Sequence, residues 1–285
     1  MALDTISARN RRKRYAKRTA KPVMAEDIYA MQKVFEKNAW LTYPGYYHIL
    51  ISHAELMSKL SEEQKNMYLD LTQELLWICE YANEIVEPLN KILEQFKSIS
   101  TFYAIRCTPL KDQKWSKSSG IVLYEIKNPS VSKQLKKPIK ILDRIEDLKQ
   151  LKIKDSDLFI LVDDFVGTGD TADKCMADML KANAGVEKKM VVMSVAVHRE
   201  GINRLSAQGI PVFTSHVLKR GITDVYSGYK LSRYTQLMKD IEAAFNIKSY
   251  NFGYGGSEAL ICLKRCPNNT FPIYWHGKKS PYSRY

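Results

Sequence analysis

Two adjacent aspartates and a segment rich in glycine and threonine follow one hydrophobic stretch of the chain. The run LFILVDDFVGTGDTADKC covers residues 158–175, and its apolar part predicts a buried strand that ends in the pair Asp163 and Asp164. Residues 167–171 then open into a predicted helix. Their two glycines allow positive φ and close approach of the backbone, so N–H groups can surround an anion at the helix N-terminus. The spacing therefore predicts a phosphate-binding loop directly after two carboxylates.

The chemistry of these side chains indicates a phosphorylated sugar. The hydroxyls of Thr168 and Thr171 add donors to the same phosphate. The two carboxylates can hold ribose hydroxyls directly or through Mg²⁺, a hard cation that accepts carboxylates and keeps several waters. The predicted phosphate loop consists of Gly167, Thr168, Gly169, Asp170 and Thr171.

Two simpler interpretations of this run stay open. An ordinary strand–turn–helix junction can carry one aspartate as a cap and glycines in its turn, and a phosphoacceptor domain can carry an acidic pair. Neither explains two acids followed by two glycines and two threonines. The run also lacks the glycine-lysine pattern of a nucleoside-triphosphate P-loop, so we favour the sugar-phosphate site.

The segment VDDFVGTGDT resembles the signature of type I phosphoribosyltransferases, which bind 5-phosphoribosyl-1-pyrophosphate (PRPP). The resemblance implies that Asp163 and Asp164 face the ribose 2′- and 3′-hydroxyls and that residues 167–171 hold the 5′-phosphate. Some family members have an aspartate at the first loop position, where it acts as a base toward a purine. Here that position is Gly167, so the sequence departs from the purine-salvage pattern.

The length and composition of the chain limit the kinds of protein that it can be. With 285 residues, of which 45% are hydrophobic, it can form one large α/β domain or a main domain with a helical appendage. No stretch approaches the roughly 20 apolar residues that span a bilayer, and the charged N-terminus is unlike a signal peptide. We therefore expect a cytoplasmic protein without a membrane contact. The five scattered cysteines argue against a disulfide framework, and the pair in ICLKRC lacks further zinc ligands.

The pattern of elements predicts four parts. Residues 1–25 are expected to be a basic, disordered arm without apolar periodicity. Residues 26–98 are expected to form a helical lobe with Trp40 and Trp77 in its interior. Strands that alternate with helices over residues 99–250 predict a parallel sheet, the phosphoribosyltransferase-like α/β core. Residues 251–285 add a strand and an aromatic segment that we call the hood.

The basic arm carries much of the charge. Eight Lys or Arg residues lie between Arg9 and Lys21, within a chain of net charge +13. Such a block suits contact with the phosphate backbone of nucleic acid. A solubilising tail, or a contact with an acidic protein partner, explains it equally well.

The resemblance also assigns a pyrophosphate loop, which follows the first core strand FYAIRC. The candidates are Lys117, Ser118 and Ser119, with Gly120 and Arg106 beside them. A lysine neutralises pyrophosphate charge, and hydroxyls and amides before a helix supply directed donors. An ordinary exposed loop remains the alternative.

Two further segments could reach this site. Family members often close a flap over the reaction centre, and the polar run NPSVSKQLKKP suits such a flap, which would bring Lys136 and Lys137 to the pyrophosphate. A solvated loop explains the run as well. His198 ends a predicted strand, where we favour a structural or rim role.

The hood combines two asparagines with three aromatic residues. Phe271, Tyr274 and Trp275 can stack on a nucleobase or fill a core. Asn268 and Asn269 can bond a base edge or form a turn after proline. With the helical lobe, the segment PNNTFPIYW is similar to a prokaryotic subfamily of phosphoribosyltransferase-like effectors in bacterial conflict and phage-defence systems.

These observations support two hypotheses. The first is an enzyme that acts with Mg²⁺ at the anomeric carbon of PRPP or a related ribose-phosphate nucleotide. In it, Asp163 and Asp164 hold ribose and metal while Lys117 and the serines bind pyrophosphate. The acceptor is a nucleotide, a nucleic acid or water. The alternative is a subunit that senses PRPP or a nucleotide without turnover and docks on protein partners and nucleic acid, for example a reverse transcriptase with its RNA or DNA.

Overall fold

A parallel sheet of five strands forms the centre of the computed structural model, which describes residues 23–112, 118–278 and 280–283. The strands follow the order β3-β2-β4-β5-β6, and every neighbouring pair runs parallel. Their bounds are β2 Thr101–Arg106, β3 Ile139–Leu142, β4 Asp157–Val166, β5 Met190–His198 and β6 Val212–Leu218. The predicted parallel α/β fold is confirmed.

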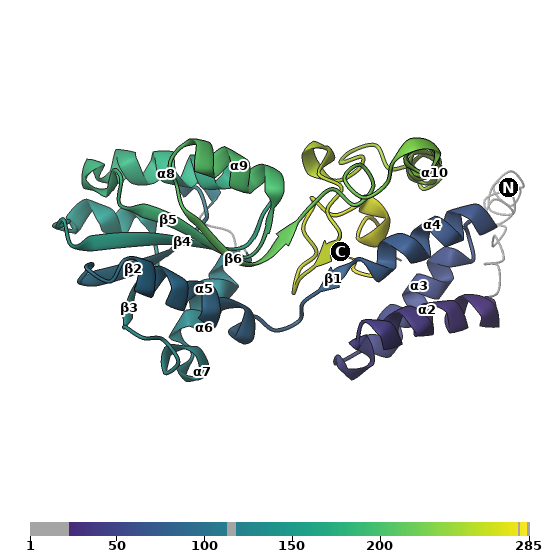
Figure 1. Ribbon diagram of the computed structural model, residues 1–285, viewed down its shortest axis with the longest axis horizontal. Coiled ribbons are helices and arrows are strands. Elements are labelled where there is room, and N and C mark those ends of the chain that lie inside the picture. The colour runs from purple at the N-terminus through teal and green to yellow at the C-terminus, as the bar shows by residue number, and fades with distance from the viewer. Residues whose placement is uncertain (1–22, 113–117, 279, 284–285) are drawn as a thin grey trace, which may run out of the picture.

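Helices cover both faces of this sheet (Figure 1). One face packs against α5 (Ala82–Gln95), α6 (Ser119–Lys127) and the short α7 (Pro129–Ser132). The other face packs against α8 (Asp170–Ala182) and α9 (Arg199–Ala207). Successive side chains of a strand point to opposite faces, so the apolar residues of β4 divide between the two cores. The even-numbered ones from 158 to 162 join the α5/α6 side, and 159 and 161 join the α8/α9 side.

A second body contains the N-terminal helices and the hood (Figure 1). Its helices are α2 (Ala25–Lys37), α3 (Tyr46–Met57), α4 (Glu62–Gln73) and α10 (Gly228–Ala244). Ser61 caps α4, since its side chain accepts from Gln64 N while the Gln64 side chain accepts from Ser61 N. Trp40 and Trp77 lie inside this body with ring centroids 5.5 Å apart, as expected. Short 3₁₀ helices occur at Trp40–Thr42, Leu110–Asp112, Ile145–Gln150, Ala184–Val186, Tyr254–Gly256 and Pro272–Tyr274.

The structure differs from the expected helical lobe at its C-terminal part. After α4, the strand β1 (Leu76–Trp77) pairs in parallel with β7 (Ile261–Cys262) of the hood. The following helix α5 contains Pro88 and contributes its apolar stripe to the core of the sheet. Helix α5 therefore packs on the sheet, although the helices that precede it in the sequence belong to the second body. The β1–β7 pair joins the hood to the segment that leads into the core.

None of the helices in the described residues has both the length and the apolar character that a membrane crossing requires.

Candidate functional site

A cavity of about 420 Å³ opens at the carboxyl ends of β2 and β4. The chain leaves β2 toward β3 on one side and returns to β4 on the other, and ligands of open α/β sheets bind where the strand order reverses in this way. The core contributes Cys107, Thr108, Ser118, Ser119, Asp163, Asp164 and the phosphate loop to the wall. The hood contributes Tyr254, Arg265, Pro267, Asn268 and Asn269. The predicted acidic pair and phosphate loop thus share one cavity.

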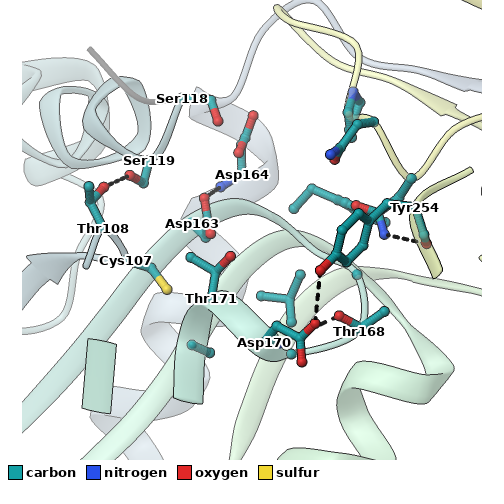
Figure 2. A pocket seen from close by; sticks show the side chains of 18 of the residues that line it. Cys107, Thr108, Ser118, Ser119, Asp163, Asp164, Thr168, Asp170, Thr171 and Tyr254 are labelled. Carbon is teal, nitrogen blue, oxygen red and sulfur yellow. Dashed lines mark hydrogen bonds between the residues drawn. The ribbon is translucent and has the colours of Figure 1, made fainter. Parts of the chain in front are cut away.

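Asp163 and Asp164 have different surroundings (Figure 2). Asp163 Oδ1 accepts a hydrogen bond of 2.9 Å from Asp164 N, and its carboxyl lies near the thiol of Cys107. Asp164 Oδ2 instead accepts from the hydroxyl of Tyr81 at 3.3 Å, and its carboxyl also bonds the side chain of Ser118. Each acid has its own set of partners, although the two are adjacent in sequence.

Burial shifts both carboxyl groups toward their neutral forms. It raises the pKa of Asp163 well above its usual range, and the nearby Cys107 and Asp164 add to this rise. Burial also raises the pKa of Asp164, while hydrogen bonds from Ser118 and Tyr81 act in the opposite direction. A cation or sugar hydroxyls in the cavity would replace the lost solvation. Strongly shifted acids in a cleft indicate a functional site.

The phosphate loop leads directly into the N-terminus of α8. Gly169 has φ +87° and is the residue before the first helical residue, Asp170, a conformation that favours glycine. The carboxylate of Asp170 has partners outside the loop, because Arg204 Nη1 donates to its Oδ1 at 2.5 Å and the hydroxyl of Tyr254 donates to its Oδ2 at 3.3 Å. Thr168 and Thr171 line the cavity, and their role as donors to a phosphate stays a prediction. The loop is thus held from behind by α9 and from the side by the hood.

A family model described as PRTase-CE matches residues 48–284. The chain belongs to the PRTase-CE family. A crystal structure of orotate phosphoribosyltransferase from Aeropyrum pernix also matches, with 12% identity and a TM-score of 0.26 over 56% of this chain and 73% of that one, values too low to carry an argument. No curated protein matches the sequence. The expected phosphoribosyltransferase-like type I fold is therefore confirmed by the family match and by the sheet itself.

In this PRTase-CE chain, two of the predicted pyrophosphate ligands reach the cavity. Ser119 begins α6 and its hydroxyl lies 2.7 Å from that of Thr108, and Ser118 precedes it beside Asp164. Lys117 lies outside the described residues. Arg106 and Gly120 line a neighbouring cavity of about 620 Å³ instead.

The two lysines of the proposed flap do not line the site cavity. They precede β3, whose first residue Ile139 pairs with Phe102 near the amino end of β2. Lys136 pairs with Glu94, and Lys137 Nζ donates to two backbone carbonyls after α5. The two lysines thus lie near the amino ends of the strands, whereas the acidic pair lies at the carboxyl end of β4.

His198 has a structural position in the PRTase-CE chain. It ends β5 and caps α9, since its Nδ1 accepts from Glu200 N at 3.3 Å. Its side chain does not line the cavity, which agrees with the role that we favoured.

The hood places its asparagines, and not its aromatic cluster, at the site. Phe271, Tyr274 and Trp275 are at most 2% exposed in the core of the second body, so the core interpretation is confirmed. Asn268 and Asn269 line the cavity.

Among the residues around the site that sequence reasoning missed, three come from segments outside the strands of the sheet. Tyr81 bonds Asp164, Tyr254 bonds Asp170, and Arg265 lines the cavity. Tyr254 lies in a glycine-rich segment, which gives no signal of a contact with Asp170. No local pattern marks Tyr81 or Arg265, because their positions depend on packing between distant segments.

Proposed function

We propose that this chain is a phosphoribosyltransferase-like enzyme that makes or breaks a bond at the anomeric carbon of PRPP or a related ribose-phosphate nucleotide. One observation carries the proposal. The acidic pair of β4, the glycine loop before α8 and the serines that begin α6 line a single cavity at the carboxyl ends of β2 and β4. A ribose with phosphates at both ends has the complementary chemistry, since hydroxyls meet carboxylates and phosphates meet helix N-termini.

Each part of the cavity has a role in this proposal. The amides of residues 167–171 bind the 5′-phosphate, and the carboxylates of Asp163 and Asp164 accept hydrogen bonds from the ribose hydroxyls. Ser118 and Ser119, together with the N-terminus of α6, hold the pyrophosphate at the other end of the sugar. Fixing both ends of the substrate orients the anomeric carbon toward the hood.

The residues of the cavity also fit Mg²⁺. Within the described residues, no group of three or more His, Cys, Asp or Glu side chains forms a metal cage. Mg²⁺ needs no such cage, because it commonly takes one or two carboxylates and completes its shell with water and substrate phosphates. Asp163 and Asp164 are two buried carboxyl groups with raised pKa values, and a cation would favour their ionised forms. When bound there, Mg²⁺ would neutralise the charge of the departing pyrophosphate.

We also place this activity in a cytoplasmic anti-phage defence system. The similarity of the helical lobe and hood to conflict effectors supports this role. The basic segment between Arg9 and Lys21 supports a nucleic-acid or acidic protein partner. A PRPP-sensing subunit without turnover is the competing outcome of the test below.

The test uses purified protein, Mg²⁺ and PRPP labelled in its pyrophosphate. The proposal predicts release of labelled pyrophosphate, with water as the acceptor when no other is added. The double variant Asp163→Asn with Asp164→Asn should release none. Asp155→Asn is the matched control, since Asp155 is fully exposed and pairs with Lys189 far from the cavity. Binding of PRPP without release would instead indicate the sensor, and no binding would refute the site.

A further inference from the structure

The hood crosses the site cavity along one short segment, Lys264–Asn269, which we call the crossing segment. Its first residue lies beside the ribose end of the site, because Lys264 N donates to Tyr81 OH at 3.2 Å and that hydroxyl bonds Asp164 at 3.3 Å. Its last residue lies beside the phosphate loop, where Asn269 fills the space next to Gly167. The segment between them therefore lines the cavity from the acidic pair to the phosphate loop, and a sugar held as proposed would have its anomeric carbon near it.

The crossing segment is fixed by its own hydrogen bonds. Ala259 N donates to Asn269 O at 3.1 Å, and the hydroxyl of Ser257 donates to the same oxygen at 2.8 Å. Thr270 Oγ1 donates to Ile261 O at 2.6 Å, which ties the end of the segment to β7. The end of its backbone consequently has a defined position relative to β7. A residue on it can act as a specificity determinant.

Arg265 is the cation that this segment brings to the cavity. The other charged side chains of the described wall are Lys174 on α8 and the four carboxyl groups of Asp112, Asp163, Asp164 and Asp170. Among the described residues, no carboxylate or hydrogen-bond partner holds the Arg265 guanidinium.

Two nearby cations differ in this respect. Lys264 Nζ binds Glu125 at 3.0 Å and lies 5.0 Å from the centre of the Tyr81 ring. Arg204 is held by Asp170 and Asp173. Both side chains form ion pairs within the protein, whereas Arg265 has no such pair among the described residues and can bind a ligand.

We infer that Arg265 recognises a negatively charged group, a carboxylate or a phosphate, on the molecule that reacts with the anomeric carbon. This inference rests on the proposed function and narrows its acceptor to an anionic one. The guanidinium forms paired hydrogen bonds with such groups and stays charged at every physiological pH. The pyrophosphate is the less suitable partner, since Ser118, Ser119 and the N-terminus of α6 already face its place from the core.

The test measures binding of matched probe pairs by calorimetry, with saturating ribose 5-phosphate and Mg²⁺ filling the sugar site without allowing transfer. Orotate against uracil tests a carboxylate, and uridine 5′-monophosphate against uridine tests a phosphate. At least one anionic probe should bind about 10-fold or more tightly than its neutral partner, as expected for a charge-assisted hydrogen bond. The pair that shows the preference identifies the group.

Three variants complete the experiment. Arg265→Gln should abolish the preference while the affinity for ribose 5-phosphate stays within about twofold, and Arg265→Lys should keep part of it. Arg233→Gln on α10, which removes an arginine that pairs with Glu63, should change neither. Equal binding within both pairs, no binding of any probe, or a preference that survives in Arg265→Gln would overturn the inference. A loss of pyrophosphate affinity in Arg265→Gln would overturn it too. Failure of wild-type protein to bind ribose 5-phosphate would instead count against the proposed function.

Discussion

Asn269 of the hood occupies the space that a side chain at Gly167 would need. A Cβ atom built on Gly167 would lie 2.6 Å from Asn269 Cγ, well inside the contact distance of two carbon atoms. Gly167 is the position where some phosphoribosyltransferases carry an aspartate base. With Asn269 in this position the hood leaves no room for a side chain at residue 167, so deprotonation of an acceptor must depend on another group or on the acceptor itself.

This relationship predicts a rescue experiment. Gly167→Ala should displace Asn269 and distort the loop, and such overpacking costs about 1–3 kcal/mol. Ribose 5-phosphate should therefore bind the variant about 10-fold or more weakly than it binds the wild type. The double variant Gly167→Ala with Asn269→Gly should recover most of that affinity, since the methyl group then has room. Calorimetry measures both. Equal affinities of the two variants would show that Asn269 is not the obstacle.

Tyr81 should act as a positioning residue for Asp164. Tyr81→Phe removes a donor to the carboxylate and leaves Lys264 N without its acceptor, which should cost about 1–3 kcal/mol of unfolding free energy. The hydrogen bond from Tyr81 lowers the pKa of Asp164, so its loss should raise that pKa further and move the acid limb of ribose 5-phosphate binding to higher pH.

Tyr274→Phe is the matched control for that variant, because it removes a buried hydroxyl that bonds Thr72 away from the site. Chemical denaturation and the pH profile of binding measure both variants. If Tyr81→Phe lowered stability but left the pH profile of ribose 5-phosphate binding unchanged, Tyr81 would have a structural role only.

The buried carboxyl group of Asp163 should lower the free energy of unfolding at neutral pH. Burial raises its pKa in the folded protein, so above the unfolded value of about 3.9 the folded state keeps a proton that the unfolded state has lost. The free energy of unfolding then falls as the pH rises through that window. Asp163→Asn removes the titration, and it should be about 1 kcal/mol more stable at neutral pH, or about 2–4 °C in Tm.

Thermal unfolding from pH 4 to pH 8 tests whether stability falls as the pH rises. The advantage of Asp163→Asn should be smallest near pH 4 and grow toward pH 8. Ribose 5-phosphate with Mg²⁺ should raise the Tm of the wild type but not of the variant. A variant that is less stable at every pH would show that the carboxylate serves the fold.

The cysteines should differ in reactivity. Cys79 is partly exposed, whereas the other four are buried. The hydrogen bond with Cys175, and then burial, raise the pKa of Cys107 well above its usual range, so its reactive thiolate is scarce. A disulfide reagent at pH 8 should label Cys79 at least about 10-fold faster than Cys107, as read by mass spectrometry. Rapid labelling of Cys107 in the folded protein would contradict its burial beside Asp163.

Local patterns predicted the elements that carry their own signals. The apolar run before Asp163 and the glycines of the phosphate loop each depend on a few neighbouring residues, and the structure has both. The packing partner of α5 could not be predicted from its own residues, because an amphipathic stripe can pack against a sheet or against other helices.

The contacts between distant segments could not be predicted. Tyr81 and Asp164 are 83 residues apart, and Lys264 is 183 residues from Tyr81. Their contact depends on the parallel pairing of two-residue strands, β1 with β7, which are too short to give a periodic signal. The acidic pair, the phosphate loop and the serines of the cavity could therefore be named from the sequence, whereas of the wall contributed by the hood only Asn268 and Asn269 were named.

A crystal structure with PRPP and Mg²⁺ would show whether the acidic pair of β4 and the loop before α8 hold the two parts of one sugar phosphate. We predict the 5′-phosphate against the amides of residues 167–171, the ribose hydroxyls at Asp163 and Asp164, and the pyrophosphate beside Ser118 and Ser119. A ligand bound elsewhere, or one whose ribose does not touch the acidic pair, would contradict the account.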